Sequence, residues 1–192
     1  MIIGGKDLLN GKRFDKGGYI LTYDYDKWSF IDPKEAQKKL NLPRNPRDYT
    51  SIAVTTDDSN DEIVYASSMG DGVIQYKNGT PVQSYNEKNA FKETAGGYGS
   101  GYCYIDGLAF DKNGNLWMTS SEVNHAVLVL DKAGAWHRLD IEQLRGVYTI
   151  NDILITSTND KWIYVPRNTP KLVMIPNSES LDEVPRMSYY TY

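Results

Sequence analysis

Short apolar runs and polar turns alternate along this chain, and the same order recurs three times. In each case two apolar runs flank a turn rich in Asn, Asp and Gly, residue types that tolerate the positive φ angles of a tight hairpin. The paired runs are residues 52–54 with 63–67, 108–110 with 116–120, and 153–155 with 162–165. The pattern predicts three β-hairpins.

A third apolar run follows each hairpin, at residues 73–76, 127–130 and 172–175. After the first two, short turns lead to a fourth run, at residues 81–85 and 136–139. The unit is therefore expected to be a four-stranded antiparallel meander. Its first strand recurs at intervals of 56 and 45 residues, close to the roughly 40–50 residues of a β-propeller blade. The longer interval is explained by an inserted loop at 86–102.

The N-terminal segment resembles the end of such a unit. Residues 19–24 and 27–32 match residues 127–131 and 135–140, with Trp28 and Trp136 at the start of the last strand. The sequence thus predicts an all-β fold, a partial β-propeller of about three and a half to four four-stranded antiparallel blades. We place a partial blade at 1–48 and full blades at 49–103, 104–147 and 148–192.

Two short helices are predicted where one blade connects to the next. Asp32, Pro33 and Glu35 have the order of an N-cap, an N1 proline and an N3 glutamate, so a helix is expected over residues 33–40. A single helical turn is expected at 140–145, closed by Gly146.

Composition narrows the class of protein. The 23 aromatic residues exclude disorder of the whole chain, and the net charge of −4 argues against binding to nucleic acid. No apolar run approaches the roughly 20 residues that a membrane span needs. Cys103 is the single cysteine, which excludes an intrachain disulfide and a cysteine-based zinc cluster. No secretory signal is visible at residues 1–6, so we expect a cytoplasmic protein or a chain without its original N-terminus.

Two stretches resemble known propeller repeats. Residues 107–117, Gly-Leu-Ala-Phe-Asp-Lys-Asn-Gly-Asn-Leu-Trp, are similar to the two-component regulator propeller repeat. Residues 65–76 and 85–89 are similar to the PorZ-like propellers of the Bacteroidetes type IX secretion system. The resemblance spans about residues 19–175. It implies a periplasmic or cell-surface setting and a non-catalytic binding or scaffolding role, in a sensor or in a secretion apparatus, with no cofactor. Such relatives have more blades than this chain supplies.

A second function stays open, because propellers also host enzymes of the lyase or lactonase type that act on extracellular carbohydrates or small molecules. These enzymes need metal ligands or acid and base groups that converge on the innermost loops. Here the starts of the innermost strands offer Asp106, Asn151 and Asp152 but no histidine. We therefore expect no catalytic residues.

Other candidates for chemistry have simpler explanations. Asp111, Asn113 and Glu122 partly match a calcium loop, but position six is Leu116 instead of glycine, so a hairpin turn is expected. The acidic residues 57–62 and the Asn-Gly-Thr at 78–80 are likewise expected to be turns, and no metal site is predicted. His125 lies in a connection, and His137 is expected to be exposed on an edge strand. Cys103 is expected to be buried.

The glycine- and tyrosine-rich segment 95–102 comes directly before an innermost strand and is either an inter-blade linker or a binding loop. We predict that Tyr98, Tyr102, Asp106, Asn151 and Asp152, here called the mouth residues, contact a glycan or protein ligand at one end of the propeller axis. Trp117 and Trp162 are expected in the core between blades.

An incomplete propeller exposes two apolar blade faces, one at each end of the arc. Exposed apolar patches of more than a few hundred Å² drive association. We expect the chain to cover these faces by pairing with a second copy or with further blades of a parent protein. Whether residues 187–192 supply the fourth strand of the last blade stays open at this stage.

Overall fold

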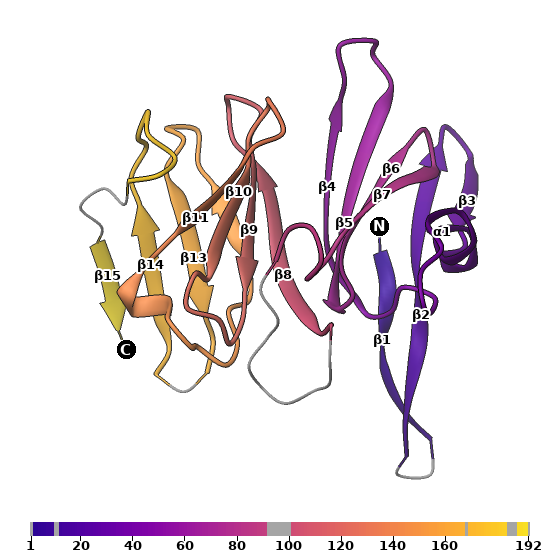
Figure 1. The fold of residues 1–192 in the computed structure, drawn as a ribbon, viewed down its shortest axis with the longest axis horizontal. Coiled ribbons are helices and arrows are strands. Elements are labelled where there is room, and N and C mark those ends of the chain that lie inside the picture. The colour runs from indigo at the N-terminus through magenta and orange to yellow at the C-terminus, as the bar shows by residue number, and fades with distance from the viewer. Residues whose placement is uncertain (1, 10–11, 92–100, 168, 184–187, 192) are drawn as a thin grey trace.

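The strands lie side by side as a row of antiparallel blades in the computed structural model, which describes residues 2–9, 12–91, 101–167, 169–183 and 188–191 (Figure 1). The first unit has three strands: β1 (Ile2–Leu9), β2 (Lys12–Asp24) and β3 (Lys27–Ile31). The second comprises β4 (Tyr49–Thr56), β5 (Glu62–Gly70), β6 (Gly72–Lys77) and β7 (Thr80–Tyr85).

The third unit comprises β8 (Cys103–Phe110), β9 (Leu116–Ser120), β10 (Val127–Leu130) and β11 (Trp136–Leu139). The fourth comprises β12 (Ile153–Ile155), β13 (Lys161–Val165), β14 (Lys171–Ile175) and β15 (Ser188–Thr191). Consecutive strands within each unit pair in antiparallel order. The prediction of an all-β partial propeller built from four-stranded meanders is confirmed.

The ends of the chain resolve two open points of the sequence pattern. At the C-terminus β15 pairs with β14, with Tyr190 opposite Leu172, so the tail supplies the fourth strand of the last blade. At the N-terminus β1 and β2 form a hairpin that runs into β3. The second and third blades join directly, because Met69 and Gly70 at the end of β5 pair with Tyr104 and Cys103 at the start of β8.

Both predicted helical segments are present. α1 spans Pro33–Leu40, and the carboxylate of Asp32 accepts a hydrogen bond from the backbone N–H of Lys34 at 2.9 Å. Asn41 ends the helix in the left-handed conformation. The second segment is a short 3-10 helix, Glu142–Leu144, followed by Gly146 with a φ of 64°. Each segment follows the last strand of a blade, as expected.

Asp111 explains why the Gly-Asn-Leu-Trp repeat makes a sharp hairpin. Its Oδ1 accepts hydrogen bonds from the backbone N–H groups of Asn113 and Asn115, each at 2.9 Å. Its Oδ2 accepts from the Asn115 amide and from Trp117 Nε1, also at 2.9 Å. The carboxylate thus satisfies four donors inside one hairpin and ties the turn to the core tryptophan, which supports the hairpin interpretation over the calcium loop.

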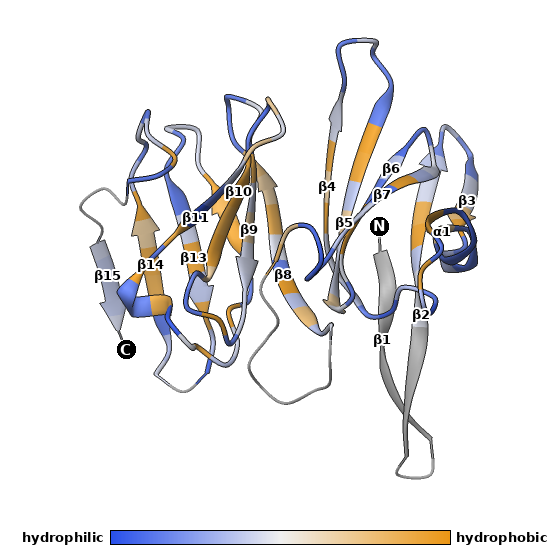
Figure 2. Cartoon of the chain, in the orientation of Figure 1, coloured by the Kyte–Doolittle hydropathy of each residue, from blue (hydrophilic) through white to orange (hydrophobic). Residues whose placement is uncertain are grey.

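The apolar core lies between the blades because alternate residues of each strand point to opposite neighbours. On β9, Leu116 and Met118 pack toward the second blade, whereas Trp117 packs toward the fourth. The strands therefore read as nearly continuous apolar runs, and Figure 2 shows them as hydrophobic bands separated by hydrophilic turns. Gly107 lets the innermost strands β8 and β12 approach closely, since a Cβ there would lie 2.6 Å from the backbone nitrogen of Ile153.

Two blade faces lack a neighbour among the described residues. The N-terminal end face carries Tyr23 and Trp28, which are in ring contact at 4.9 Å, together with Phe30. The C-terminal end face is a hollow of about 480 Å³ lined chiefly by Leu154, Trp162, Tyr164 and Leu172, with Tyr190 stacked on Trp162 at 6.4 Å.

Two predictions about individual side chains are wrong. Trp162 is not part of the core: it is half-buried and lines the hollow on the C-terminal end face, which no blade among the described residues covers, whereas Trp117 is buried as predicted. His137 is not exposed. Its ring nitrogens contact Asp182 at 2.7 Å and Asp131 at 3.1 Å, which holds the ring against the blade.

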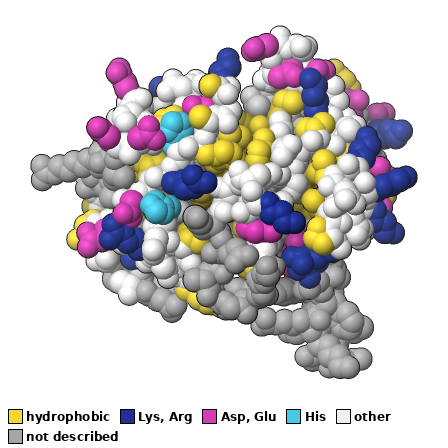
Figure 3. All heavy atoms as spheres, in the orientation of Figure 1, with side chains coloured by type: hydrophobic (Ala, Val, Ile, Leu, Met, Phe, Trp, Pro, Cys, Tyr) yellow, Lys and Arg dark blue, Asp and Glu magenta, His cyan; other side chains and the backbone are white. Residues whose placement is uncertain are grey.

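The surface in view carries charges of both signs, and basic side chains gather where α1 lies (Figure 3). α1 itself contributes Lys34, Lys38 and Lys39. None of the described helices has the length and apolar character needed to cross a membrane.

Candidate functional site

The mouth residues are only partly brought together. Asp106 lies on β8 and Asp152 directly before β12, and these innermost strands are in contact at Gly107. Tyr102 packs over Gly70, where an added Cβ would lie 2.6 Å from its ring. Asn151 is exposed, and its backbone N–H donates to the Tyr164 carbonyl at 2.9 Å. Tyr98 lies outside the described residues.

Asp106 is the mouth residue with the most unusual environment. Its side chain is buried, and Ser121 Oγ donates to its Oδ2 at 2.8 Å. Burial raises the pKa of this carboxyl to about 7, and the negative charge of Asp152 adds to the increase. The hydroxyls of Ser121 and Tyr104 lower the pKa in part. Because Ser67 Oγ donates to the Asp106 carbonyl at 2.8 Å, the residue also connects two blades.

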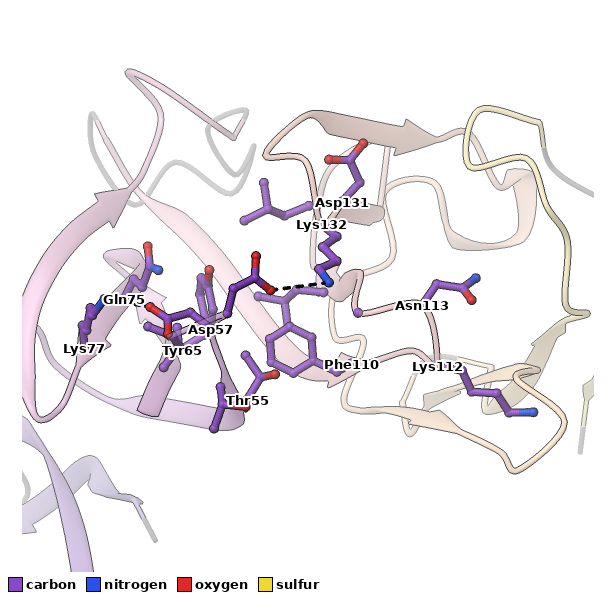
Figure 4. Close-up of a pocket in the computed structure, with 16 residues that line it drawn as sticks. Thr55, Asp57, Tyr65, Gln75, Lys77, Phe110, Lys112, Asn113, Asp131 and Lys132 are labelled. Atoms are coloured by element: carbon purple, nitrogen blue, oxygen red, sulfur yellow. Dashed lines mark hydrogen bonds and ion pairs between the residues drawn. The ribbon is translucent and has the colours of Figure 1, made fainter. Parts of the chain in front are cut away.

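A cleft of about 520 Å³ separates the turns of the second and third blades, at the ends of β4 and β8 (Figure 4). Its apolar lining includes Ile63, Tyr65, Phe110, Leu116 and Leu130. The Tyr65 and Phe110 rings meet edge to face with centroids 5.9 Å apart. Burial raises the pKa of the Tyr65 hydroxyl to about 12, so this group is neutral at physiological pH.

The rim of the cleft is polar and carries both signs of charge. Lys77 lies between Asp57 and Asp61, with its Nζ 2.7 and 2.8 Å from their carboxylate oxygens. These hydrogen bonds from Lys77 lower the pKa of both carboxyls. From the other wall Lys132 reaches toward Asp58, with 3.9 Å between Nζ and Oδ1, as Figure 4 shows.

The turn chemistry explains the shape of this rim. Asp57 Oδ1 accepts hydrogen bonds from the backbone N–H groups of Ser59 and Asp61, which repeats the pattern of Asp111 on the next blade. The amide of Gln75 faces the cleft and accepts a hydrogen bond from Tyr85 Oη at 3.0 Å. The acidic run 57–62 therefore forms a turn in which Lys77 pairs with two of the four carboxylates, Asp57 and Asp61.

Sequence reasoning did not find this cleft. The run 57–62 was visible as a cluster of acids, but its lysine partner lies on a different hairpin, and Lys132 comes from the next blade. The alignment of the three hairpins could have indicated the cleft, because equivalent turns of neighbouring blades lie next to each other in a propeller.

The other chemistry candidates have structural partners. His125 is exposed, and Asp182 and Asp131 raise the pKa of His137 by accepting hydrogen bonds from its ring. Among the described residues no group of three or more His, Cys, Asp or Glu side chains is placed to hold a metal ion. Cys103 is buried, as predicted. Asn78 adopts a φ of 47° and accepts a hydrogen bond from the Glu62 N–H, in line with the predicted turn.

Comparison with known proteins gives no match to a family model or to a curated sequence. Among solved structures, the chain is similar to PorZ, described as an essential bacterial surface component of the type IX secretion system of Porphyromonas gingivalis. The TM-score is 0.76 with 21% identity, covering 98% of this chain and 26% of PorZ.

It is also similar to the extracellular domain of BT4673 from B. thetaiotaomicron, with a TM-score of 0.51 and 16% identity, over 75% of this chain and 18% of that one. The chain thus spans about a quarter or less of each of these proteins. Because the sequence identities are this low, the similarity establishes a shared fold and nothing further. The resemblance to PorZ-like and regulator propellers that the repeats indicated is confirmed at that level.

Proposed function

We propose that the chain is a non-catalytic binding module of an extracytoplasmic propeller and that the inter-blade cleft holds its ligand, a carbohydrate. The observation that carries the proposal is the combination in one cleft of an aromatic lining, Tyr65 and Phe110, with a rim of amide and charged side chains. A sugar ring has an apolar face and a hydroxyl edge, so it matches both parts.

The similar structures support an extracytoplasmic location for the module. PorZ is described as a surface component, and the BT4673 domain as extracellular. A module in that setting meets ligands from outside the cell, either as the sensor part of a regulator or as part of a secretion apparatus.

The partners of the acidic side chains favour a binding function over catalysis. Asp57 and Asp61 are ion-paired with Lys77, and Asp111 is saturated by donors of its own hairpin. Because these carboxylates already accept hydrogen bonds or ion pairs that stabilise the turns, they are not available as catalytic acids or bases. One observation favours the propeller enzyme: Asp106 has a pKa of about 7, which suits a general acid or base. Its burial and its bond to Ser121 keep it from substrate in this conformation.

Calorimetric titration of the purified chain with neutral oligosaccharides, such as cellohexaose, xylohexaose and maltohexaose, tests the proposal. We expect binding of at least one of them, and loss of that binding in the cleft variants Gln75→Ala and Lys132→Ala. The mouth variants Asn151→Ala and Asp152→Ala are the matched controls, since both side chains are exposed.

Three results would contradict the proposal. If none of the oligosaccharides bound, a carbohydrate would be excluded as the ligand of the cleft. Loss of binding in the mouth variants alone would move the site to the residues that the sequence indicated. Cleavage of a bound oligosaccharide would establish the enzyme instead.

A further inference from the structure

Three side chains on the second-blade wall of the cleft form a chain of hydrogen bonds with one direction. Burial raises the pKa of the Tyr65 and Tyr85 hydroxyls, and the hydrogen bond between them adds to the increase at Tyr65 and opposes it at Tyr85, which identifies Tyr65 as the donor. Tyr85 Oη in turn donates to Gln75 Oε1 at 3.0 Å. The carbonyl oxygen of Gln75 is therefore occupied, and its NH₂ group is the part that can donate to a ligand in the cleft (Figure 4).

The lining around this donor is apolar. Ile63, Leu116 and Leu130 face the cleft and are each no more than 7% exposed. The rings of Tyr65 and Phe110 complete this lining in their edge-to-face contact. A methyl group placed against these side chains would be removed from water, which favours binding.

The carboxylates that line the cleft offer few oxygens to a ligand. Asp57 accepts from two backbone N–H groups of its turn and from Lys77. Asp131 accepts from a backbone N–H of its own turn at 2.7 Å and contacts a histidine ring at 3.1 Å. Asp58, the third carboxylate of the lining, faces Lys132. A sugar hydroxyl brings a proton that needs an acceptor, whereas a carbonyl oxygen only accepts. The cleft therefore favours a ligand group that accepts without donating in return.

We infer that the cleft recognises N-acetylated sugars, with the acetamido carbonyl accepting from Gln75 Nε2 and the acetamido methyl group on the apolar lining. The inference rests on the proposed function and names the class of carbohydrate. An acetamido group joins an accepting carbonyl to a methyl group, so it matches both features of the cleft. Its N–H can donate to the hydroxyl of Thr55, which also lines the cleft. Tyr85 is a positioning residue, because it orients the Gln75 amide.

Cellohexaose and chitohexaose are a matched pair of probes. They share the same backbone linkage and differ only in the acetamido group that replaces one hydroxyl on each sugar. Calorimetric titration of the native chain should give an affinity for chitohexaose at least about tenfold higher, the combined effect of one hydrogen bond and one buried methyl group.

Two variants test the roles of Gln75 and Tyr85 through the ratio of the two affinities. Gln75→Glu replaces the donating NH₂ group with an oxygen at nearly the same size, so the preference for chitohexaose should disappear. Tyr85→Phe leaves Gln75 in place without its hydrogen bond and should reduce the preference. A loss of structure alone would weaken both oligosaccharides alike and would leave the ratio unchanged.

Tyr76→Phe is the matched control, because it removes another buried hydroxyl from the same strand. Tyr76 follows Gln75 on β6 and packs on the opposite side of the blade, where its hydroxyl contacts Tyr49 Oη at 2.6 Å. This variant should keep the affinity ratio of the native chain.

The outcomes separate this inference from the proposed function. Equal affinity of the native chain for the two oligosaccharides would overturn the preference for acetamido groups and leave a carbohydrate-binding cleft. An unchanged ratio in Gln75→Glu would overturn it as well, since the acetamido group would then contact another part of the chain. Absence of binding to chitohexaose, cellohexaose and the other oligosaccharides would overturn the proposed function itself.

Discussion

Trp136 and Trp28 occupy equivalent positions on two blades, yet one is packed between blades and the other is exposed. The difference does not lie in the local sequence, since both lie at the start of the last strand of their blade and face an apolar residue of the strand before it. It lies in whether another blade stands beside them. In this fold the neighbour decides which apolar residues form the core, because each blade is apolar on both faces and contributes half of every interface.

The largest expected effect is at the covered tryptophan of the third blade. Trp117→Ala should lower the free energy of unfolding by about 3–5 kcal/mol, as truncation of large buried aromatics does. Trp28→Ala should cost less than about 1 kcal/mol, because most of its surface is already exposed. Urea unfolding at low micromolar concentration measures both values. Equal losses would mean that Trp28 is covered within a single chain.

The two equivalent turn aspartates sharpen the comparison. Asp111→Ala leaves four donors without their acceptor, two of them the side chains of Asn115 and Trp117, and should cost about 2–4 kcal/mol. Asp57→Ala removes two backbone contacts and an exposed ion pair, so its cost should be clearly smaller. The measurement is the difference between the two urea midpoints. A larger effect at Asp57 would contradict the structural role assigned to Asp111.

A pH effect follows from the buried carboxyl of Asp106. Burial raises its folded-state pKa from 3.8 to about 7, so the folded state binds the proton more tightly than the unfolded state does. The associated stability is present below pH 4 and is lost as the pH rises toward 7, with a slope of at most about 1.4 kcal/mol per pH unit. Asp106→Asn should remove this slope.

Urea unfolding of the native chain and of Asp106→Asn at pH 5 and pH 8 measures this difference. Subtracting the two proteins cancels the contributions of the titratable groups that both proteins share. We expect the variant to gain stability relative to the native chain at pH 8. A pH-independent difference would mean that the carboxyl is solvated.

The smallest effect is expected at His137. Asp182 and then Asp131 raise its pKa by hydrogen bonding, so this contact stabilises the fold at acid pH and fades as the pH rises through the folded-state pKa. In Asp182→Asn, an NMR titration of the ring should give a lower pKa than in the native chain. An unchanged pKa would show that the contact does not form in solution.

Repeat spacing and turn chemistry predicted most of the fold. The hairpins, their third and fourth strands and the helix at Pro33–Leu40 depend on local signals such as Asn-Gly turns and the Asp32 cap. Trp162 was misplaced because a strand that is apolar on both faces does not reveal which neighbour is missing. His137 was misplaced because Asp182 is 45 residues away in sequence.

The candidate site was less predictable. Asp106 and Asp152 were expected near each other because both lie at innermost strands, and the structure places their charges close enough to interact. The cleft was not expected. Lys77 meets Asp57 and Asp61 only when the two hairpins of the second blade lie side by side. Lys132 approaches Asp58 only when the third blade stands next to the second. Charge pairs between repeats depend on three-dimensional packing, which a single sequence does not display.

The central claim is that the chain is an open arc with two uncovered apolar faces. Hydroxyl-radical footprinting of the native chain tests it directly, because oxidation of each tryptophan reports how far that side chain is exposed. At low micromolar concentration we predict strong oxidation of Trp28, which is 59% exposed, and protection of Trp117, which is 3% exposed. Trp28 as protected as Trp117 at every dilution would contradict the account, since it would mean that the four blades close on themselves within one chain.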